Sequence, residues 1–531
     1  MAAGQGPSCY LGFDFSTQQI KVIAIDDNLN VIHESAVKFD TDLPHYKTQG
    51  GVHIHTDNVT ITAPPVMWVE ALDLLLDRMK ASGFDFSKVV ALSGAGQQHG
   101  SVYWNGCARE TLNNLQPGTS LHTQLKDSFT RESPIWMDAS TTRQCRTMED
   151  SVGGAMKLAE ITGSKGYERF TGNQIMKVRQ NEPDIYTNTE RISLVSSFAA
   201  CLFLGDFAPI DYSDGSGMNL LDIRSRGWSE KCLQACGNNL EEKLGHACPS
   251  SQKLGGVSSY FVERYSFCTD CQVVAFTGDN PASLAGMAPC EGDIVVSLGT
   301  SDSVFLWLTE PTPGLDGHIF VNPVNSSQYM GLTCFKNGSL TRENVKDEYA
   351  GGSWDTFAKH LADTPLGNSG NIGIYFDVTE IQPVACGRFR FSASDKELSS
   401  FPASTEVRAV IESQMMSRRV HSENLGMKFG KGTRVLATGG ASINTSILQV
   451  MADVFNAPVF VTDVPNSAAL GSCYRAKHGL FEGNIPFSDI VKNHPEPVCV
   501  ARPVEAAEKI YDALCDRYRA LENQIADGTH H

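Results

Sequence analysis

The fold is decided by the segment Tyr10-Leu-Gly-Phe-Asp-Phe-Ser-Thr-Gln-Gln-Ile-Lys-Val-Ile-Ala-Ile25, in which two apolar runs flank a short polar turn. The apolar residues on either side of the turn at residues 16–19 predict two β-strands joined by a tight hairpin. After the polar turn at residues 26–30, residues 31–37 predict a third strand. The pattern as a whole predicts an antiparallel meander at the start of an α/β domain.

A second strand–turn–strand pattern occurs far downstream, where apolar runs at residues 293–298 and 303–308 flank Gly299-Thr-Ser301. Two such hairpins in one chain predict a duplicated architecture, with each half offering a hairpin loop to a shared cleft. We therefore expect two domains, 1–288 and 289–531, with the boundary near residues 286–292.

Other segments predict helices and buried strands between these hairpins. Residues 65–80 carry apolar side chains at helical spacing, namely Trp68, Leu72, Leu75, Leu76 and Met79. Short apolar runs predict buried strands at residues 89–92, 273–278 and 434–440, and a helix is expected from about residue 444 to 455. Mixed strands and helices place the chain in the α/β class.

Charge and composition exclude several classes of partner. The chain of 531 residues has 43 Lys and Arg against 60 Asp and Glu, giving a formal net charge of −17. Because binding to nucleic acid or anionic membranes needs clustered basic residues, we expect neither partner. The longest apolar run, near residues 194–204, is too short to span a bilayer. The N-terminus has no signal-peptide pattern and the cysteines are sparse, which predicts a cytoplasmic protein with free thiols.

The two turns suit phosphate binding. Backbone N–H groups and hydroxyls of a tight Gly, Ser and Thr turn can cradle phosphate oxygens without a basic side chain. Asp14 stands beside Ser16, Thr17 and Gln18, and a Mg²⁺ ion would relieve the repulsion between its carboxylate and a phosphate. For either hairpin alone, a solvated turn remains the simpler interpretation. The P-loop and GxGxxG consensus patterns are both missing.

Asp279 follows a buried strand and precedes Asn280 and Pro281, at the edge of a sheet where α/β proteins often place reactive groups. A carboxylate there is positioned to accept a proton from an acceptor hydroxyl during phosphoryl transfer. The alternative interpretation is an aspartate that caps the helix starting at Pro281.

Several polar segments are candidates for binding a sugar or an adenosine. His99, within Gly94-Ala-Gly-Gln-Gln-His-Gly100, and Arg169 are suited to hydroxyl groups, although a structural histidine and a surface salt bridge are the simpler interpretations. Asp138 and residues 211–214 are candidates of the same kind, with turns as the alternative. The paired glycines in Thr438-Gly-Gly-Ala-Ser-Ile-Asn444 would let a flat ring approach the backbone.

Together these segments resemble the FGGY family of carbohydrate kinases over nearly the whole chain. Gly12-Phe-Asp-Phe-Ser-Thr-Gln18 and Ser297-Leu-Gly-Thr-Ser301 are similar to the two phosphate loops of the family. Gly278-Asp-Asn280 is similar to its catalytic-base motif, and Thr438-Gly-Gly-Ala-Ser442 to its adenosine motif. The resemblance implies a two-domain actin-like, ribonuclease H-like ATPase fold with duplicated mixed-sheet domains around a central cleft.

The resemblance also implies an activity, which is ATP-dependent phosphorylation of a ketopentose, D-xylulose, at its fifth carbon, with ATP and Mg²⁺ required. It implies Asp279 as the general base and Asp14 as the magnesium residue. The implied sugar-binding residues are Gln98, His99, Arg169, Asp279 and Asn280. The implied nucleotide-binding residues are Ser16, Thr17, Gln18, Gly299, Thr300, Trp354, Gly440, Ala441 and Asn444.

One departure from the family pattern lies at Lys177-Val-Arg-Gln180, where the family usually has Trp in the last position. This puts the wall of the sugar site near Gln180 in doubt. Ribulose, gluconate and glycerol kinases share the phosphate-facing motifs, so they remain alternatives, as does a non-catalytic sugar- or nucleotide-responsive protein. A chaperone-type ATPase would need a further domain, for which residues 457–531 are too few, whereas a filament-forming relative remains open. A monomer is favoured, with the oligomeric state left open.

Overall fold

The computed structural model describes residues 8–430, 432–462 and 464–528. They form two compact units that are not contiguous in sequence. Unit 1 falls within Met1–Ala288, Ile319–Tyr329 and Pro465–His494, and unit 2 within Pro289–His318, Met330–Val464 and Pro495–His531. The division into domains 1–288 and 289–531 stays a prediction, and the units differ from it because two segments of the second half pack into unit 1.

The predicted meander opens unit 1. Strands β1 (Cys9–Phe15), β2 (Gln19–Asp26) and β3 (Val31–Lys38) pair antiparallel in that order. Every residue of β1 is buried, because this strand is covered on both faces. The turn is closed by a hydrogen bond of 3.0 Å from the Ser16 N–H to the Gln19 carbonyl.

The sheet continues with parallel strands on the other side of β1. Strand β6 (Val89–Gly96) is parallel to β1, β15 (Gln272–Val274) is parallel to β6, and β14 (Lys253–Gly256) pairs antiparallel with β15. The single strand predicted at residues 273–278 is wrong, since it divides into β15 and β16 (Thr277–Gly278). Val273 pairs with Leu92 but Thr277 pairs with Ala95, so one extra residue interrupts the ladder, as in a β-bulge.

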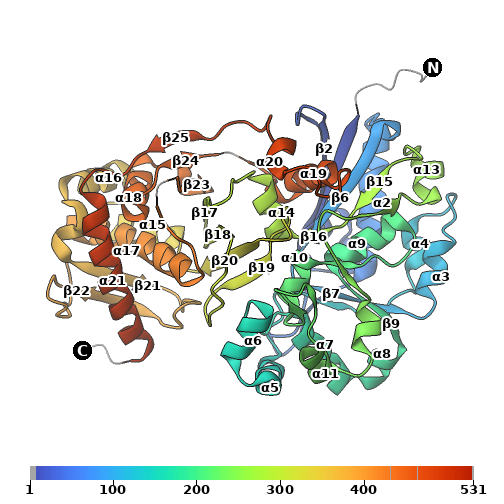
Figure 1. Cartoon of the computed structure of the whole chain (residues 1–531), viewed down its shortest axis with the longest axis horizontal. Helices are drawn as coiled ribbons and strands as arrows, with labels where there is room; N and C mark the ends of the chain where they lie inside the picture. Colours follow the sequence, from blue (N-terminus) through green and yellow to red (C-terminus); the bar gives the residue numbers. More distant parts are fainter. Residues whose placement is uncertain (1–7, 431, 463, 529–531) are drawn as a thin grey trace. The chain divides into compact units, whose positions relative to one another are not determined.

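Helices cover this sheet. The predicted helix is present as α2 (Pro65–Ala81), and the apolar run near residue 200 forms α9 (Val195–Leu204). Helix α19 (Ser467–Gly479), drawn in red in Figure 1, lies beside β2 and β6, drawn in blue, although more than 370 residues separate them. The approach is close, since a Cβ on Gly12 would lie 2.0 Å from the Ala469 carbonyl oxygen. Only glycine fits there.

Smaller elements complete unit 1. Its other helices are α1 (Phe39–Asp42), α3 (Ala108–Asn113), α4 (Leu121–Leu125), α5 (Thr142–Val152), α6 (Ala155–Thr162), α7 (Thr171–Asn181), α8 (Pro183–Asn188), α10 (Tyr212–Gly215), α11 (Glu230–Cys236), α12 (Leu240–Leu244), α13 (Ser259–Tyr265), α14 (Asp279–Gly286) and α20 (Phe487–Ile490). Its other strands are β4 (His53–Ile54), β5 (Ile61–Ala63), β7 (Ser101–Asn105), β8 (Ser133–Pro134), β9 (Thr189–Leu194), β10 (Ile210–Asp211), β11 (Leu221–Asp222), β12 (Gly227–Trp228), β13 (Ala247–Cys248) and most of β19 (His318–Val321).

Unit 2 repeats the topology of the first sheet. Its strands, in the order β20-β18-β17-β23-β24-β25, are β20 (Tyr329–Phe335), β18 (Asp302–Leu308), β17 (Ile294–Leu298), β23 (Val435–Thr438), β24 (Val459–Val461) and β25 (Val498–Ala501). Strand β17 is antiparallel to β18 and parallel to β23, β24 is parallel to β23, and β25 is antiparallel to β24. This is the arrangement of β1, β2, β6, β15 and β14 in unit 1, as expected for a duplicated α/β architecture.

The helix predicted from about residue 444 to 455 is present in unit 2 as α18 (Thr445–Phe455). The others are α15 (Ser339–Tyr349), α16 (Trp354–Asp363), α17 (Ala403–Asn424) and α21 (Ala507–Ala526), and a small hairpin pairs β21 (Ile372–Phe376) with β22 (Gly387–Phe391). Across the described part of the chain, every helix is too short or too polar to traverse a membrane. All fifteen cysteines have free thiols.

Candidate active site

The sheet of unit 1 brings the first hairpin turn next to the segment that contains His99. Because β1 and β6 are parallel and Phe15 pairs with Gly96, both strands end at the same edge of the sheet. The Gln97 N–H donates to the Phe15 carbonyl at 2.9 Å, and the Thr17 hydroxyl lies 3.5 Å from the Gln97 Oε1. Ser16 and Thr17 are half-buried and Gln18 is exposed.

Asp14 is the last but one residue of β1, and the residue is only 4 % exposed. The Ser16 hydroxyl donates to Asp14 Oδ2 at 2.6 Å, and Lys21 Nζ lies 4.0 Å from the same oxygen. Burial raises the pKa of Asp14, and the Ser16 bond and the Lys21 charge lower it in part. Asp14 Oδ1 is buried without a hydrogen-bond partner among the described residues, so it has capacity for a ligand.

Asp279 is the first residue of α14, directly after β16. The helix N-cap is Gly278, so the interpretation of Asp279 as the capping residue is wrong. Asp279 Oδ1 accepts hydrogen bonds from the N–H groups of Asn280, at 2.9 Å, and Gln98, at 3.3 Å. Burial, followed by the negative charge of Asp14, raises the pKa of Asp279 to about 7. A carboxylate with that pKa can exchange a proton near neutral pH.

Gln98 and Asn280 form one polar cluster with Asp279. The Asn280 Nδ2 donates to the Gln98 Oε1 at 2.8 Å and lies 3.3 Å from Asp279 Oδ1. These contacts fix the orientation of both amides beside the carboxylate, so the three predicted sugar-binding residues lie together.

His99 is held in an unusual conformation beside this cluster. Its φ of +69° is uncommon for a residue other than glycine. The ring stacks on Phe170 with centroids 4.5 Å apart, and Nδ1 lies 2.9 Å from the Gly217 carbonyl oxygen. Burial lowers the pKa of His99 to about 4, with the hydrogen bond to the Gly217 carbonyl opposing this shift and the Arg169 charge adding to it. The neutral imidazole therefore donates from Nδ1 to Gly217 and keeps Nε2 as an acceptor.

Arg169 packs on aromatic rings. Its guanidinium lies 5.3 Å from the Trp136 ring centroid and 5.7 Å from that of Tyr167, which is cation–π geometry. Trp136 also reaches the first hairpin turn, because its Nε1 donates to the Thr17 hydroxyl at 2.8 Å. Sequence reasoning missed Trp136, and its neighbour Asp138 was singled out in its place.

Asp138 serves the local structure. It is buried and accepts a hydrogen bond from the Ser140 N–H at 3.0 Å, which supports the turn interpretation. The Ile61 N–H, at 3.0 Å, and the Gln174 Nε2, at 2.8 Å, also donate to its carboxylate. Gln180, the departure from the family pattern, is exposed at the end of α7 and accepts a hydrogen bond of 2.8 Å from Gln144. Its side chain therefore links α7 to α5.

A buried carboxylate pair lies beneath Asp279. Asp211 and Asp214 are 0 % and 1 % exposed, and Asp211 caps α10 by accepting from the Ser213 and Asp214 N–H groups at 3.3 and 3.1 Å, which agrees with the turn interpretation. The pKa values of both are raised, chiefly by burial, and the charge of Asp279 contributes to that of Asp214. Arg475 of α19 is fully buried nearby, and burial lowers its pKa to about 10, opposed first by the charge of Asp211. No local sequence signal pointed to Arg475.

Unit 2 contains a cavity of about 740 Å³. All six nucleotide-site residues predicted in this unit line the cavity, namely Gly299, Thr300, Trp354, Gly440, Ala441 and Asn444. The other lining residues are Leu298, Ser339, Arg342, Glu343, Asp355, Ala358, Ile443, Thr445, Ser446 and Ile447. The three predicted segments are far apart in the chain, and the fold brings them to one hollow. Its volume suits a nucleotide-sized ligand.

Two of these residues have defined local roles. Trp354 begins α16 and is 38 % exposed, with Lys346 Nζ 5.2 Å from its ring centroid. Asn444 is the N-cap of α18, and its Oδ1 accepts from the N–H groups of Ser446 and Ile447 at 3.1 and 3.2 Å. The exposed indole thus offers a flat surface for an aromatic base.

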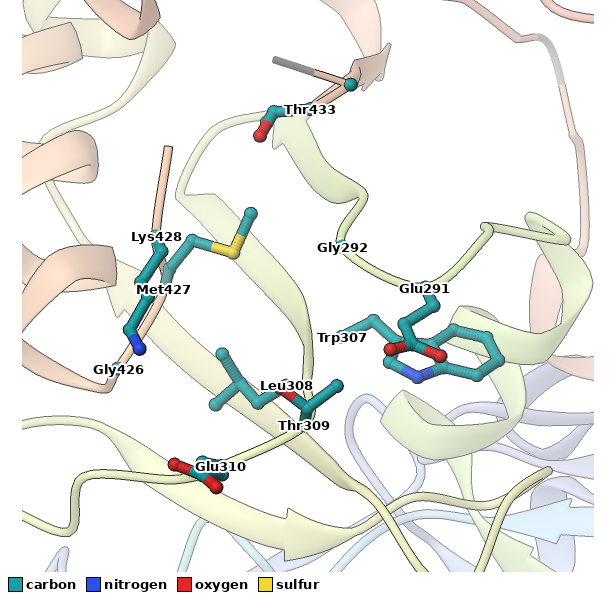
Figure 2. A pocket seen from close by; sticks show the side chains of 11 residues that line it. Glu291, Gly292, Trp307, Leu308, Thr309, Glu310, Gly426, Met427, Lys428 and Thr433 are labelled. Carbon is teal, nitrogen blue, oxygen red and sulfur yellow. The ribbon is translucent and has the colours of Figure 1, made fainter. Parts of the chain in front are cut away.

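A different hollow in unit 2, of about 570 Å³, contains none of the predicted site residues. Figure 2 shows Glu291 beside the Trp307 ring on one side, and Met427 and Lys428 on the other. Glu291 precedes β17 and Glu310 follows β18, whereas the 299–301 turn joins the opposite ends of these strands. This hollow therefore lies at the far end of the hairpin from the predicted phosphate loop.

Comparison with known families matches both halves of the chain. Residues 125–286 match the N-terminal domain of the FGGY family of carbohydrate kinases, and residues 294–480 match its C-terminal domain.

Named proteins and solved structures agree with this match. The chain is 58% identical to "Xylulose kinase" of Rattus norvegicus over 99% of this chain and 98% of that protein. It is 44% identical to "Xylulose kinase 2" of Arabidopsis thaliana, over 99% of this chain and 98% of that protein. The fold is similar to that of a xyloylose kinase from Brucella ovis, with a TM-score of 0.78 and 20% sequence identity over 97% of this chain and 98% of that chain. It is also similar to that of a gluconate kinase from Lactobacillus acidophilus, with a TM-score of 0.77 and 15% sequence identity over 98% of each chain. This chain belongs to the FGGY family of carbohydrate kinases.

Proposed function

We propose that the protein phosphorylates D-xylulose with ATP to give D-xylulose 5-phosphate and ADP. The observation that carries the proposal is Asp279, a carboxylate whose pKa of about 7 matches the task of a general base, placed beside Gln98 and Asn280. The choice of D-xylulose rests on the names of the relatives that are 58% and 44% identical over nearly full length.

Asp279 carries out the proton transfer in this proposal. Its ionised carboxylate removes the proton from the sugar hydroxyl as that oxygen attacks the γ-phosphorus. A new P–O bond to the sugar forms, the bond to the bridging oxygen breaks, and ADP leaves with the electron pair. Removal of the proton at the moment of attack avoids an unfavourable oxonium intermediate.

The sugar is held by groups that complement hydroxyls. His99 Nε2 accepts from one hydroxyl, because Nδ1 is already bonded to the Gly217 carbonyl. The Gln98 and Asn280 amides are fixed by their mutual bond, and Arg169 donates from its place on the aromatic rings. Several oriented groups restrict the sugar to the pose in which one primary hydroxyl meets Asp279.

The nucleotide binds to the cavity of unit 2. The adenine lies against Trp354 and the backbone at Gly440 and Ala441, and Asn444 flanks it. Gly299 and Thr300 donate to the phosphates, and we assign Ser16, Thr17 and Gln18 of the first hairpin turn to phosphate binding as well.

Asp14 fits a magnesium ion, since its Oδ1 is buried and unpaired among the described residues. Magnesium, when bound, neutralises phosphate charge in phosphoryl transfer. No group of three or more His, Cys, Asp or Glu side chains in the described ranges is arranged as a metal cage. Asp14 would therefore share the ion with water and phosphate oxygens, as Mg²⁺ usually requires.

We also propose a cytoplasmic, monomeric enzyme. Fifteen free cysteines are consistent with a reducing compartment. Light scattering coupled to gel filtration measures the mass directly, and a dimer mass would contradict the monomer.

A screen of ATP consumption tests the proposed reaction. The acceptors are D-xylulose, L-xylulose, D-ribulose, gluconate and glycerol, each with MgCl₂, and product is identified by phosphate position. We expect the highest kcat/KM for D-xylulose. A clear preference for gluconate, ribulose or glycerol would contradict the substrate, and no phosphorylation of any acceptor would favour a sugar- or nucleotide-responsive binding protein.

A further inference from the structure

We propose that a buried cluster of Asp302, Arg342 and Arg418 holds the 299–301 turn in the shape that binds the ATP phosphates. We call these three residues the arginine–aspartate cluster. The inference rests on the proposed function, because it assumes that this turn contacts phosphate. Its members are positioning residues, since they act through the backbone of the turn.

The cluster is buried and tightly paired. The exposed fractions of the three side chains are 0 %, 1 % and 3 %. Arg342 binds Asp302 through both terminal nitrogens, at 2.9 and 3.1 Å, and Arg418 Nη2 lies 2.9 Å from Asp302 Oδ2. Fork-shaped pairing of this kind fixes direction as well as distance.

Asp302 connects the arginine–aspartate cluster to the turn. It is the first residue of β18 and pairs with Leu298, the last residue of β17, so these two residues close the hairpin around residues 299–301. Because two guanidiniums hold the Asp302 carboxylate, the start of β18 is fixed where the chain leaves the turn. Lateral movement of the turn would require this buried ion cluster to separate.

A second set of contacts fixes the turn from the other side. The Ser339 N–H donates to the Gly299 carbonyl at 3.0 Å. A Cβ on Gly338 would lie 2.6 Å from the Thr300 carbonyl oxygen and 2.9 Å from Asp302 Oδ1, so the backbone at 338 packs directly on the turn. Helix α17 supports this segment, because Gln414 Nε2 and Arg418 Nη2 donate to the Asn337 carbonyl at 3.0 and 3.1 Å.

The cluster also leaves a positive charge behind the turn. Two guanidiniums face one carboxylate, and Arg342 lines the 740 Å³ cavity together with Thr300. Three carboxylates offset this charge, because Glu380 accepts from the Lys336 and Asn337 N–H groups and Glu343 and Asp355 line the same cavity.

The alternative is that the cluster only stabilises unit 2. A matched control exists in the same unit, where Glu406 is buried and Arg390 Nε donates to it at 2.6 Å. Neither Glu406 nor Arg390 lines the cavity. Loss of either buried carboxylate charge is expected to lower stability, but only one of them lies at the phosphate turn.

The test compares Asp302→Asn with Glu406→Gln in the full-length protein. Calorimetric titration measures affinity for ATP with MgCl₂ and for adenosine, which has no phosphate. For Asp302→Asn we expect ATP affinity to fall roughly tenfold or more, as for loss of a hydrogen bond to a charged group, with adenosine affinity within about twofold of wild type. Glu406→Gln should leave both affinities unchanged, and KM for the sugar should not move in either variant.

Arg418→Lys provides a second variant that keeps the charge and removes the planar fork. We expect it to weaken ATP binding less than Asp302→Asn and to leave adenosine binding intact. Equal losses for ATP and adenosine in both variants, or ATP affinity at the wild-type level, would overturn the inference. Wild-type protein that binds no ATP at all would instead overturn the proposed function, and the inference with it.

Discussion

Three buried carboxylates of unit 2 are paired with arginine side chains, whereas three buried carboxylates of unit 1 are bonded to hydroxyl groups. In unit 2, Asp302, Glu406 and Glu412 have guanidinium nitrogens at 2.9, 2.6 and 2.6 Å. Each of these negative charges is compensated at short range. Because arginines already bind these three carboxylates, we expect their contribution to be structural.

Three buried carboxylates of unit 1, Asp14, Asp211 and Asp214, are 4 %, 0 % and 1 % exposed. Serine and threonine hydroxyls supply their side-chain hydrogen bonds, as Ser16 does for Asp14 and Ser196 for Asp214. Hydroxyls stabilise a carboxylate without neutralising it. The raised pKa values of all three follow first from burial, and the Asp14 charge in turn raises the pKa of Asp279.

The two hairpins show the same difference at equivalent places. In the first hairpin, Asp14 keeps one buried oxygen without a partner among the described residues. In the second, Asp302 is bonded through both oxygens. We infer that one copy of the duplicated hairpin supplies an oxygen ligand and the other supplies a rigid support.

The largest expected effect is at Asp279. Asp279→Asn removes the only proposed proton acceptor and should lower kcat by roughly 10³-fold, within the range for loss of a general base. Steady-state kinetics measures the loss, and ATP affinity, measured by titration, serves as the control and should not change. A variant with near-normal kcat would show that another group is the base.

Asp14→Asn should have the next largest effect. The substitution keeps the shape but removes the charge that would hold magnesium, so we expect kcat to fall about 10²-fold and the MgCl₂ concentration for half-maximal rate to rise. Rates measured against MgCl₂ concentration provide the test. An unchanged magnesium requirement would mean that Asp14 resembles Asp302 and has only a structural role.

The pH dependence follows from the pKa of Asp279 of about 7. The base must be ionised to accept a proton, so kcat/KM should be constant above this pKa and fall about tenfold per pH unit below it. Asp14→Asn removes a negative charge that raises this pKa, so the acid limb should move to lower pH. A profile that is flat from pH 5 to 8 in the wild type would contradict the assignment.

The smallest expected effect is at Trp136. Trp136→Phe keeps a ring under Arg169 but removes the hydrogen bond to Thr17, which is worth about 1 kcal/mol, so KM for ATP should rise roughly fivefold. Trp136→Leu removes the ring as well and should also raise KM for the sugar. If both variants raise only the sugar KM, the Thr17 contact does not position the first phosphate loop.

Much of the site could be predicted because its motifs are local. Strand, turn and strand are consecutive at Ser16 and at Thr300, so apolar patterning and turn residues were enough to place both hairpins. The break between β15 and β16 was not predictable, since it depends on how residues 272–278 pair with β6. Trp136 and Arg475 were missed because their partners, Thr17 and Ser93, are distant in sequence.

The sequence by itself determined the α/β class, the two hairpins and the identity of the polar residues at their turns, because these depend on neighbours within a few positions. Only the tertiary structure decided which carboxylates are compensated. Asp14 and Asp302 both flank a hydroxyl-rich turn, but helices α15 and α17 deliver two arginines to Asp302 alone. Burial and long-range charge set the pKa of Asp279, and both depend on residues that only the folded chain brings together.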